Sequence, residues 1–265
     1  MSMIVWGWPV VVDPGAAAGI GAAIAAALAT GAHVLSLWDR DPQVRRSARE
    51  IGSRATGSVH AMEVDVTDAE AVAAAFDRLT AAHGTPDVVV HAAGIMCSGT
   101  ALDVTPQEWE RCLRVNATGV VQVTQRAARD MVGAGHGAIV VVSSNAASAP
   151  RVGLAAYGAA KAAATAFTRA LALQVAPHGV RVNLVSPGST DTPMLRGMYG
   201  DGPLDEAART SLIDGDPQAY RLGIPLRRIA SPADIAAAVR FLISDDARHI
   251  TMHDLRVDGG ATLDM

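Results

Sequence analysis

The sequence contains few charged residues, few aromatic residues and almost no cysteine. Asp, Glu, Lys and Arg make up 18% of the 265 residues, and the formal net charge is −4 at neutral pH. This weakly acidic balance argues against nucleic acid or an anionic membrane as the main partner. The two cysteines, Cys97 and Cys112, are too few for a disulfide framework, so we expect a reducing, cytoplasmic environment.

The chain also lacks a strongly hydrophobic run. Residues 14–38 carry no Asp, Glu, Lys or Arg, but alanine and glycine rather than leucine make up most of this stretch. A membrane helix needs about 20 predominantly apolar residues, and a signal peptide begins with a basic segment that is absent here. We therefore expect a soluble protein.

Short runs rich in β-branched residues alternate with longer alanine-rich stretches. This alternation predicts an α/β fold, with a doubly wound parallel sheet and helices on both faces, in a single domain over residues 1–265. The predicted strands are 9–13, 33–38, 59–64, 87–91, 138–143, 180–186 and 254–257, and the predicted helices are 20–30, 68–83, 106–132, 157–176 and 232–243. Residues 196–221 are rich in Gly, Asp and Pro, and we expect a substrate lid there because the strand pattern resumes afterwards.

A tyrosine and a lysine stand four residues apart, at Tyr157 and Lys161, in a stretch with helical character. Residues i and i+4 share a helix face, so both side chains can point into one site. A phenol has a pKa of about 10, and a nearby positive charge lowers it. Lowering it to near 7 takes about 4 kcal/mol, which the lysine ammonium and a cationic cofactor ring can supply together. The pair is a candidate base for alcohol oxidation, although Tyr-x-x-x-Lys alone is also compatible with a chance pair on a helix.

A glycine-rich turn follows the first predicted strand, with glycines at 15, 19 and 21. Such a turn lets the backbone approach a pyrophosphate, which the N-terminus of the next helix stabilises. Asp39 stands 18 residues beyond Gly21, at the end of the second predicted strand. A carboxylate there accepts both ribose hydroxyls of NAD and repels a 2′-phosphate, so NAD is favoured as cofactor. The neighbouring Arg40 is a complication, because an arginine at this place can hold the phosphate of NADP.

These motifs occur in one order along the chain: Gly15-x-x-x-Gly19-x-Gly21, His91-Ala92-Ala93-Gly94, Asn116, Ser144, Tyr157-x-x-x-Lys161 and Pro187-Gly188. Together they resemble the short-chain dehydrogenase/reductase family over nearly the whole chain. The resemblance implies an NAD(P)-binding, Rossmann-like fold with a seven-stranded sheet, and a homotetramer. It implies Tyr157 as the catalytic acid/base and Lys161 as the charge that lowers the phenol pKa. Ser144 would then bond the reacting oxygen, and Asn116 would hold a water of the proton relay.

The resemblance also implies which residues bind the cofactor. They are Gly15, Gly19, Ile20, Gly21, Asp39, Asp65, Val66, Ala93, Gly94, Tyr157, Lys161, Pro187, Gly188 and Thr192. Within this set Asp65 would lie beside the adenine and Thr192 beside the nicotinamide carboxamide. The chain departs from the family pattern at Pro14, where threonine is usual, and at His91, where asparagine is usual. Both positions stabilise the turn, so we expect them to affect cofactor affinity more than chemistry.

The C-terminal third narrows the resemblance. Segments 186–192, 222–226, 249–252 and 257–263 resemble the branch of the family that oxidises 2,3-dihydro-2,3-dihydroxybenzoate with NAD in catecholate siderophore biosynthesis. This branch implies a small cyclic dihydrodiol carboxylate as substrate, in contact with Ser144, Arg151, Tyr157 and Met194. Arg151 is a candidate clamp for the carboxylate, with Arg196 and Arg221 as weaker candidates. A solvated loop arginine is an equal alternative for Arg151.

Other functions remain open on the same residues. One is oxidation of a related dihydrodiol-type acid such as 2,3-dihydro-3-hydroxyanthranilate, and another is an NADPH-dependent carbonyl reductase of the 3-oxoacyl type, which Asp39 disfavours. A catalytically silent nucleotide sensor is disfavoured by the presence of both Tyr157 and Lys161. No metal site is expected, because the two histidines of segment 249–253 lie about 13 Å apart in an extended chain.

Overall fold

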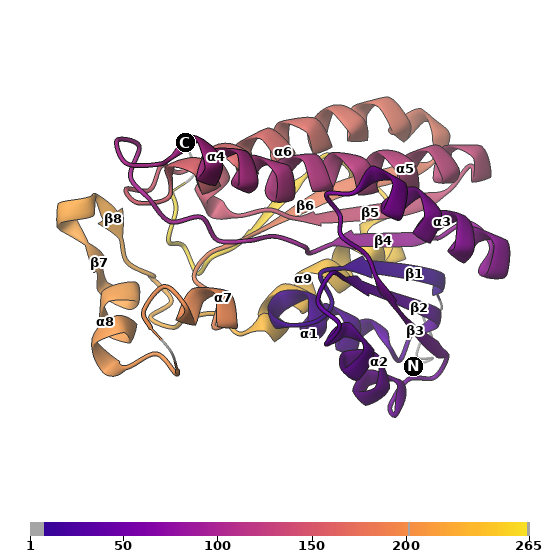
Figure 1. The fold of residues 1–265 in the computed structure, drawn as a ribbon, viewed down its shortest axis with the longest axis horizontal. Helices are drawn as coiled ribbons and strands as arrows, with labels where there is room; N and C mark the ends of the chain where they lie inside the picture. Colours follow the sequence, from indigo (N-terminus) through magenta and orange to yellow (C-terminus); the bar gives the residue numbers. More distant parts are fainter. Residues whose placement is uncertain (1–7, 201, 264–265) are drawn as a thin grey trace.

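A seven-stranded parallel sheet forms the centre of the molecule (Figure 1). The structure is a computed structural model that describes residues 8–200 and 202–263. The strands of this sheet are β1 (Trp8–Pro14), β2 (Ala32–Asp39), β3 (Ser58–Glu63), β4 (Val88–His91), β5 (Gly137–Val142), β6 (Val180–Pro187) and β9 (Asp254–Val257). Their order is β3-β2-β1-β4-β5-β6-β9, and each neighbouring pair is parallel. The order reverses between β1 and β4, and ligands of such sheets bind outside the carboxyl ends of the strands at that point.

Helices cover both faces of the sheet (Figure 1). The α-helices of the described residues are α1 (Gly19–Leu28), α2 (Val44–Gly52), α3 (Ala69–His83), α4 (Pro106–Leu113), α5 (Gly119–Ala134), α6 (Ala155–Val175), α7 (Pro193–Arg196), α8 (Glu206–Asp214) and α9 (Pro232–Ile243). Helices α1, α2 and α9 pack on one face, and α3, α5 and α6 pack on the other. All four residues of β4 are buried, as expected for a short apolar strand covered on both faces. The predicted doubly wound Rossmann-like fold is therefore confirmed.

The helix predicted over residues 106–132 is not continuous. A five-residue π-helix, η1 (Arg114–Thr118), separates α4 from α5 and contains Asn116. Helix α4 begins at a capping box in which Thr105 and Glu108 exchange side-chain and backbone hydrogen bonds. Single-turn π insertions of this kind often mark functional sites. Helix α2 was not predicted at all.

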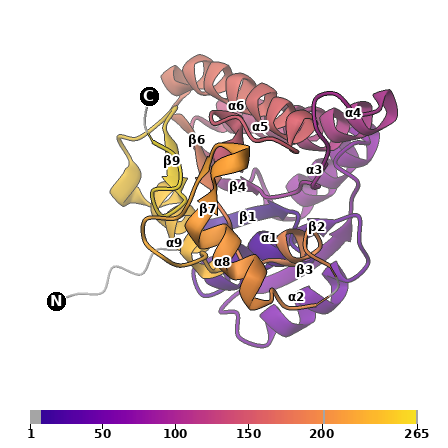
Figure 2. The same cartoon turned by 90° about the vertical axis from the view of Figure 1, so that its left-hand side faces the viewer.

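Residues 196–221, predicted as a lid, contain regular structure. They include helix α8 and most of a short hairpin made of β7 (Gly215–Asp216) and β8 (Arg221–Leu222). Asp205 caps α8 by accepting a hydrogen bond from the N–H of Ala208 at 2.7 Å. Position 201 lies outside the described residues. Figure 2 shows this segment in orange, in front of the carboxyl ends of the strands.

No helix in the described part of the chain combines the length and the apolar character needed to cross a membrane.

Candidate active site

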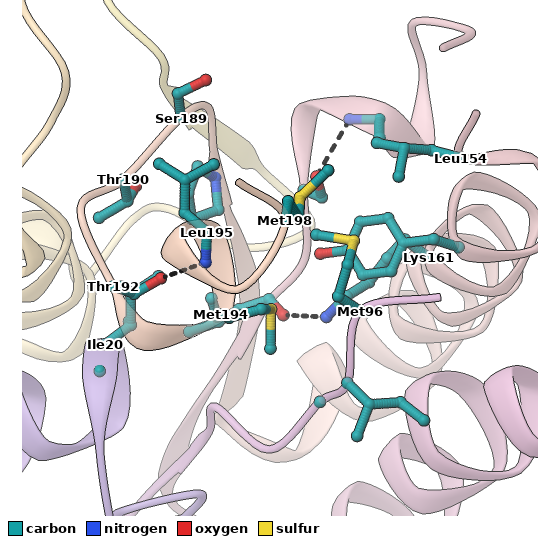
Figure 3. Close-up of a pocket in the computed structure, with 18 of the residues that line it drawn as sticks. Ile20, Met96, Leu154, Lys161, Ser189, Thr190, Thr192, Met194, Leu195 and Met198 are labelled. Atoms are coloured by element: carbon teal, nitrogen blue, oxygen red, sulfur yellow. Dashed lines mark hydrogen bonds between the residues drawn. The ribbon is translucent and has the colours of Figure 1, made fainter. Parts of the chain in front are cut away.

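A cavity of about 700 Å³ lies between the carboxyl ends of the strands and the segment that follows β6. The residues predicted to bind the cofactor or to act in catalysis line this one cavity, and so do the predicted substrate residues except Arg196. Residues separated by up to about two hundred positions meet there because parallel strands end at the same edge of a sheet. Figure 3 shows part of this wall, with Ile20 on one side and Lys161 on the other.

The glycine turn after β1 forms one end of the cavity. Gly15 has a φ of +99°, and a Cβ there would stand 2.4 Å from the backbone nitrogen of Ala93. A Cβ at Gly21 would stand 2.1 Å from the carbonyl oxygen of Gly15. Helix α1 begins without a side-chain cap at Ala18 and without an acidic residue in its first turn. Its N-terminal N–H groups are therefore available to an anion, and the turn fits a pyrophosphate.

Asp39 occupies the wall beside this turn, at the end of β2. Its carboxylate accepts hydrogen bonds from the N–H groups of Ala17 at 3.1 Å and Asp41 at 3.0 Å. These bonds hold the side chain at the cavity wall, and the remaining lone pairs can accept ribose hydroxyls. Arg40 and Asp65 line the same end of the cavity.

Tyr157 and Lys161 project from the first half of α6 and are both buried. The Lys161 ammonium donates a hydrogen bond to the carbonyl oxygen of Val142 at 3.0 Å, and its Nζ lies 5.9 Å from the centroid of the Tyr157 ring. Ser144 follows β5, and its hydroxyl lies near enough to the Tyr157 phenol to lower the pKa of that phenol. The three side chains thus form one cluster, from two elements that the sheet brings together.

Burial dominates the acidity of this cluster. It raises the pKa of Tyr157 to about 12, although the neighbouring Ser144 hydroxyl acts in the opposite direction. Burial also lowers the pKa of Lys161 to about 8. Without a cofactor, burial therefore outweighs the effects that favour the phenolate. The acidified phenol expected from the sequence depends on the lysine ammonium and a cationic cofactor ring together, so it stays a prediction.

Asn116 braces the loop after β4. Its side-chain amide accepts a hydrogen bond from the Ile95 N–H at 3.1 Å and donates one to the Ile95 carbonyl at 3.0 Å. A Cβ at Gly94 would stand 2.9 Å from Asn116 Oδ1 and 3.5 Å from Lys161 Nζ. Asn116 and Lys161 therefore share one corner of the cavity, and a side chain at position 94 would displace the Asn116 amide.

The opposite end of the cavity is lined by methionines and by arginine. Met194 and Met198 approach from the segment after β6, and Met96 approaches from the loop after β4 (Figure 3). Thr192 caps α7 by accepting a hydrogen bond from the Leu195 N–H at 3.2 Å. Arg151 reaches the cavity from the loop before α6 and is half-buried. An apolar space with a cation at its rim suits a ring that carries a carboxylate.

The geometry agrees with comparisons to known proteins. A family model described as enoyl-(acyl carrier protein) reductase matches residues 15–262. The chain is 40% identical over 252 residues to a 2,3-dihydro-2,3-dihydroxybenzoate dehydrogenase of Bacillus subtilis, covering 94% of each protein. It is 38% identical over 257 residues to a cis-4-hydroxycyclohexanecarboxylate dehydrogenase of Sinomonas cyclohexanicum, covering 96% of each protein. A solved structure of a short chain dehydrogenase/reductase family protein superposes with a TM-score of 0.82 at 32% identity, covering 97% of this chain and 98% of the other.

The chain belongs to the short-chain dehydrogenase/reductase family. It is therefore an oxidoreductase, and the family uses a nicotinamide cofactor. The glycine turn, the uncapped start of α1 and the carboxylate of Asp39 fit such a dinucleotide.

Both departures from the short-chain dehydrogenase/reductase pattern stand next to each other in the sheet. Pro14 ends β1, and its carbonyl accepts a hydrogen bond from the Ala92 N–H at 2.8 Å, directly after His91. His91 is completely buried, and burial lowers its pKa to about 3, so the ring is neutral. The predicted effect of both residues on cofactor affinity stays a prediction.

Several residues of the site were missed by sequence reasoning. Asp13, beside the glycine turn, is completely buried, and within the described residues neither carboxyl oxygen has a hydrogen-bond partner. Met96 and Met198 line the cavity from segments without a strong sequence pattern. The sequence feature that could have identified Asp13 is an acidic residue within an otherwise apolar predicted strand. Among the described residues, no group of three or more His, Cys, Asp or Glu side chains is arranged to hold a metal ion.

Proposed function

We propose that the protein oxidises the C3 alcohol of 2,3-dihydro-2,3-dihydroxybenzoate with NAD as the hydride acceptor. The cluster of Tyr157, Lys161 and Ser144, in one cavity with the glycine turn, is the observation that carries this proposal. The relatives support the substrate class. One is named for 2,3-dihydro-2,3-dihydroxybenzoate and another for cis-4-hydroxycyclohexanecarboxylate, and both names describe a six-membered ring with a hydroxyl and a carboxylate.

In this proposal Tyr157 accepts the proton of the ring hydroxyl. Ser144 donates a hydrogen bond to the reacting oxygen and holds it beside the phenol. Moving the phenol pKa from about 12 to near 7 requires about 7 kcal/mol of electrostatic stabilisation. Lys161 retains its proton at neutral pH with a pKa of about 8, so it supplies one positive charge within the buried cluster. A bound oxidised nicotinamide supplies the hydride acceptor and a second positive charge.

Asp39 supports NAD rather than NADP in this proposal. Its carboxylate is fixed at the cavity wall by two backbone N–H groups, where a 2′-phosphate would meet a negative charge. Arg40 lines the same end, and its guanidinium is the feature that would favour NADP.

The substrate ring would lie in the apolar end of the cavity. Met194 would contact the ring, and Arg151 would pair with the carboxylate. Oxidation of the C3 alcohol gives a ketone that tautomerises to a catechol, and the gain of aromaticity makes the overall step effectively irreversible. Residues 196–221 would act as the lid over this end, within a single domain that assembles as a homotetramer.

Replacing Tyr157 with Phe tests the proposal. The variant removes the hydroxyl and leaves the ring packed in place, so turnover with NAD and 2,3-dihydro-2,3-dihydroxybenzoate should fall by at least about a hundredfold. Affinity for NADH, measured by fluorescence titration, should stay within about twofold of the original protein. Turnover retained by Tyr157→Phe would refute the assignment of this residue as the base.

A further inference from the structure

Two arginines from different parts of the chain converge on the substrate end of the cavity. Arg151 lies in the loop before α6, and Arg221 begins strand β8. Burial lowers the pKa of the Arg151 guanidinium, and the positive charge of Arg221 lowers it further. Both side chains line the same cavity, so an anion bound between them would meet two positive charges.

Neither arginine is neutralised by a carboxylate in the described part of the chain, where no acidic oxygen lies within 4.0 Å of either guanidinium. Arg151 donates a long hydrogen bond of 3.4 Å to the Pro150 carbonyl. Arg221 donates to the Ser211 carbonyl at 2.8 Å. These contacts use a few of the five N–H donors that each guanidinium carries.

Two acidic residues near the pair, Asp258 and Asp216, accept hydrogen bonds from other groups. Asp258 raises the pKa of Arg151, but its oxygens accept hydrogen bonds from Asn145, Thr262 and Gly260. Asp216 lines the cavity and accepts hydrogen bonds from the backbone of residues 218 and 219. By contrast, Arg196 is paired with Asp191 at 2.7 Å. Arg196, which the sequence suggested as a candidate for binding the substrate carboxylate, is therefore a weaker candidate than Arg151 or Arg221.

The hairpin of β7 and β8 fixes the position of Arg221. Tyr220 has a φ of +51° and is 91% exposed, so the chain turns there and sends the next side chain toward the cavity. A Cβ at Gly215 would stand 2.5 Å from the Arg221 carbonyl oxygen, which shows how closely the two short strands pack. Tyr220 is a non-glycine residue in the left-handed region, so the surrounding contacts must offset its backbone strain.

We infer that Arg151 and Arg221 together bind the carboxylate of the substrate. Two guanidinium groups can each donate a pair of hydrogen bonds to a carboxylate, and a half-buried site strengthens them. The site would therefore select ring alcohols that carry a carboxylate over neutral ring alcohols. This inference rests on the proposed function for the identity of the ligand, but not for the presence of an anion site.

Equilibrium binding tests the inference without turnover. The full-length protein with saturating NADH is titrated with 2,3-dihydroxybenzoate and, separately, with catechol, which is the same ring without the carboxylate. The original protein should bind the carboxylate at least about tenfold more tightly than catechol, and Arg151→Gln or Arg221→Gln should each lose about tenfold toward the carboxylate alone. Arg221→Lys should keep part of the preference because it keeps the charge.

Arg209→Gln is the matched control, because Arg209 lies on α8 of the same segment and does not line the cavity. It should bind both ligands as the original protein does. Unchanged carboxylate binding by Arg221→Gln would overturn the inference. So would an equal loss for both ligands, or a protein without any preference for the carboxylate.

Kinetics separate this inference from the proposed function. With 2,3-dihydro-2,3-dihydroxybenzoate and NAD, Arg221→Gln should raise KM at least about tenfold and leave kcat within about threefold. Carboxylate binding that depends on both arginines, without any NADH formation, would leave the anion site standing and refute the proposed function. Turnover whose KM is unchanged by Arg151→Gln and by Arg221→Gln would refute the anion site and leave the proposed function standing.

Discussion

Asp13 is predicted to destabilise the protein at neutral pH. This residue aligns with Leu37 on the neighbouring strand, on the face that carries Val11 and packs against α1 and α9. Its carboxyl group is completely buried, and within the described residues it has no hydrogen-bond partner. Burial raises its pKa well above the usual range, and the charge of Asp39 raises it further. Between the usual carboxyl pKa and this raised value, the folded protein therefore holds Asp13 as a neutral acid.

The sign of the pH effect follows from proton binding. Above about pH 4 the unfolded chain releases this proton, whereas the folded chain keeps it until the pH reaches the raised pKa. The folded state then binds more protons, so its free energy of unfolding falls by about 1.4 kcal/mol for each pH unit in that window. Replacing Asp13 with Val removes this pH-dependent fall in the free energy of unfolding and places an apolar side chain at the same position.

Urea denaturation at pH 5, 6 and 7 measures the effect. Asp13→Val should be more stable than the original protein at pH 7, and its advantage should grow by about 1.4 kcal/mol for each pH unit. Asp13→Asn serves as the control for shape, and it should lose the pH dependence without gaining all of the stability. An advantage of the Val variant that does not change with pH would refute the reasoning, because it would mean that the carboxyl group is ionised in the folded protein.

Three further predictions concern the turn, the cofactor and a helix cap. Gly21→Ala should weaken NADH binding by at least about a hundredfold in a fluorescence titration, because its Cβ would meet the Gly15 oxygen at 2.1 Å, and wild-type affinity would contradict this. Asp39→Ser should shift the ratio of kcat/KM for NAD over NADP toward NADP by about tenfold or more, and an unchanged ratio would remove Asp39 from the ribose site. Ser231→Ala should lower the free energy of unfolding by about 1 kcal/mol, since Ser231 and Asp234 form the capping box of α9, and an unchanged denaturation midpoint would contradict it.

The sheet and the glycine turn were predictable because their signals are local. A strand such as β4 begins with three consecutive valines, and this pattern can be recognised without knowledge of its neighbours. The predicted site residues then meet because the order of strands places their carboxyl ends together. The prediction of the site residues as a set depended on the family resemblance, since no single motif was specific.

Other features depend on packing and were not predictable. The π-helix around Asn116 interrupts a stretch without an internal proline, and the residues Arg114–Thr118 do not by themselves specify a π turn. The high pKa of Tyr157 follows from burial under α4 and the loop after β5, which the sequence does not show. Arg221 reaches the cavity through a left-handed turn at Tyr220, a conformation that sequence gives no reason to expect there.

The central claim is that this cavity oxidises a ring alcohol with a nicotinamide as the acceptor. The most direct measurement is incubation of the purified protein with NAD and 2,3-dihydro-2,3-dihydroxybenzoate, following NADH by absorbance and the catechol acid by fluorescence. We predict one NADH for each 2,3-dihydroxybenzoate formed, with a higher kcat/KM for NAD than for NADP. Protein that binds NADH but forms neither product would contradict the claim.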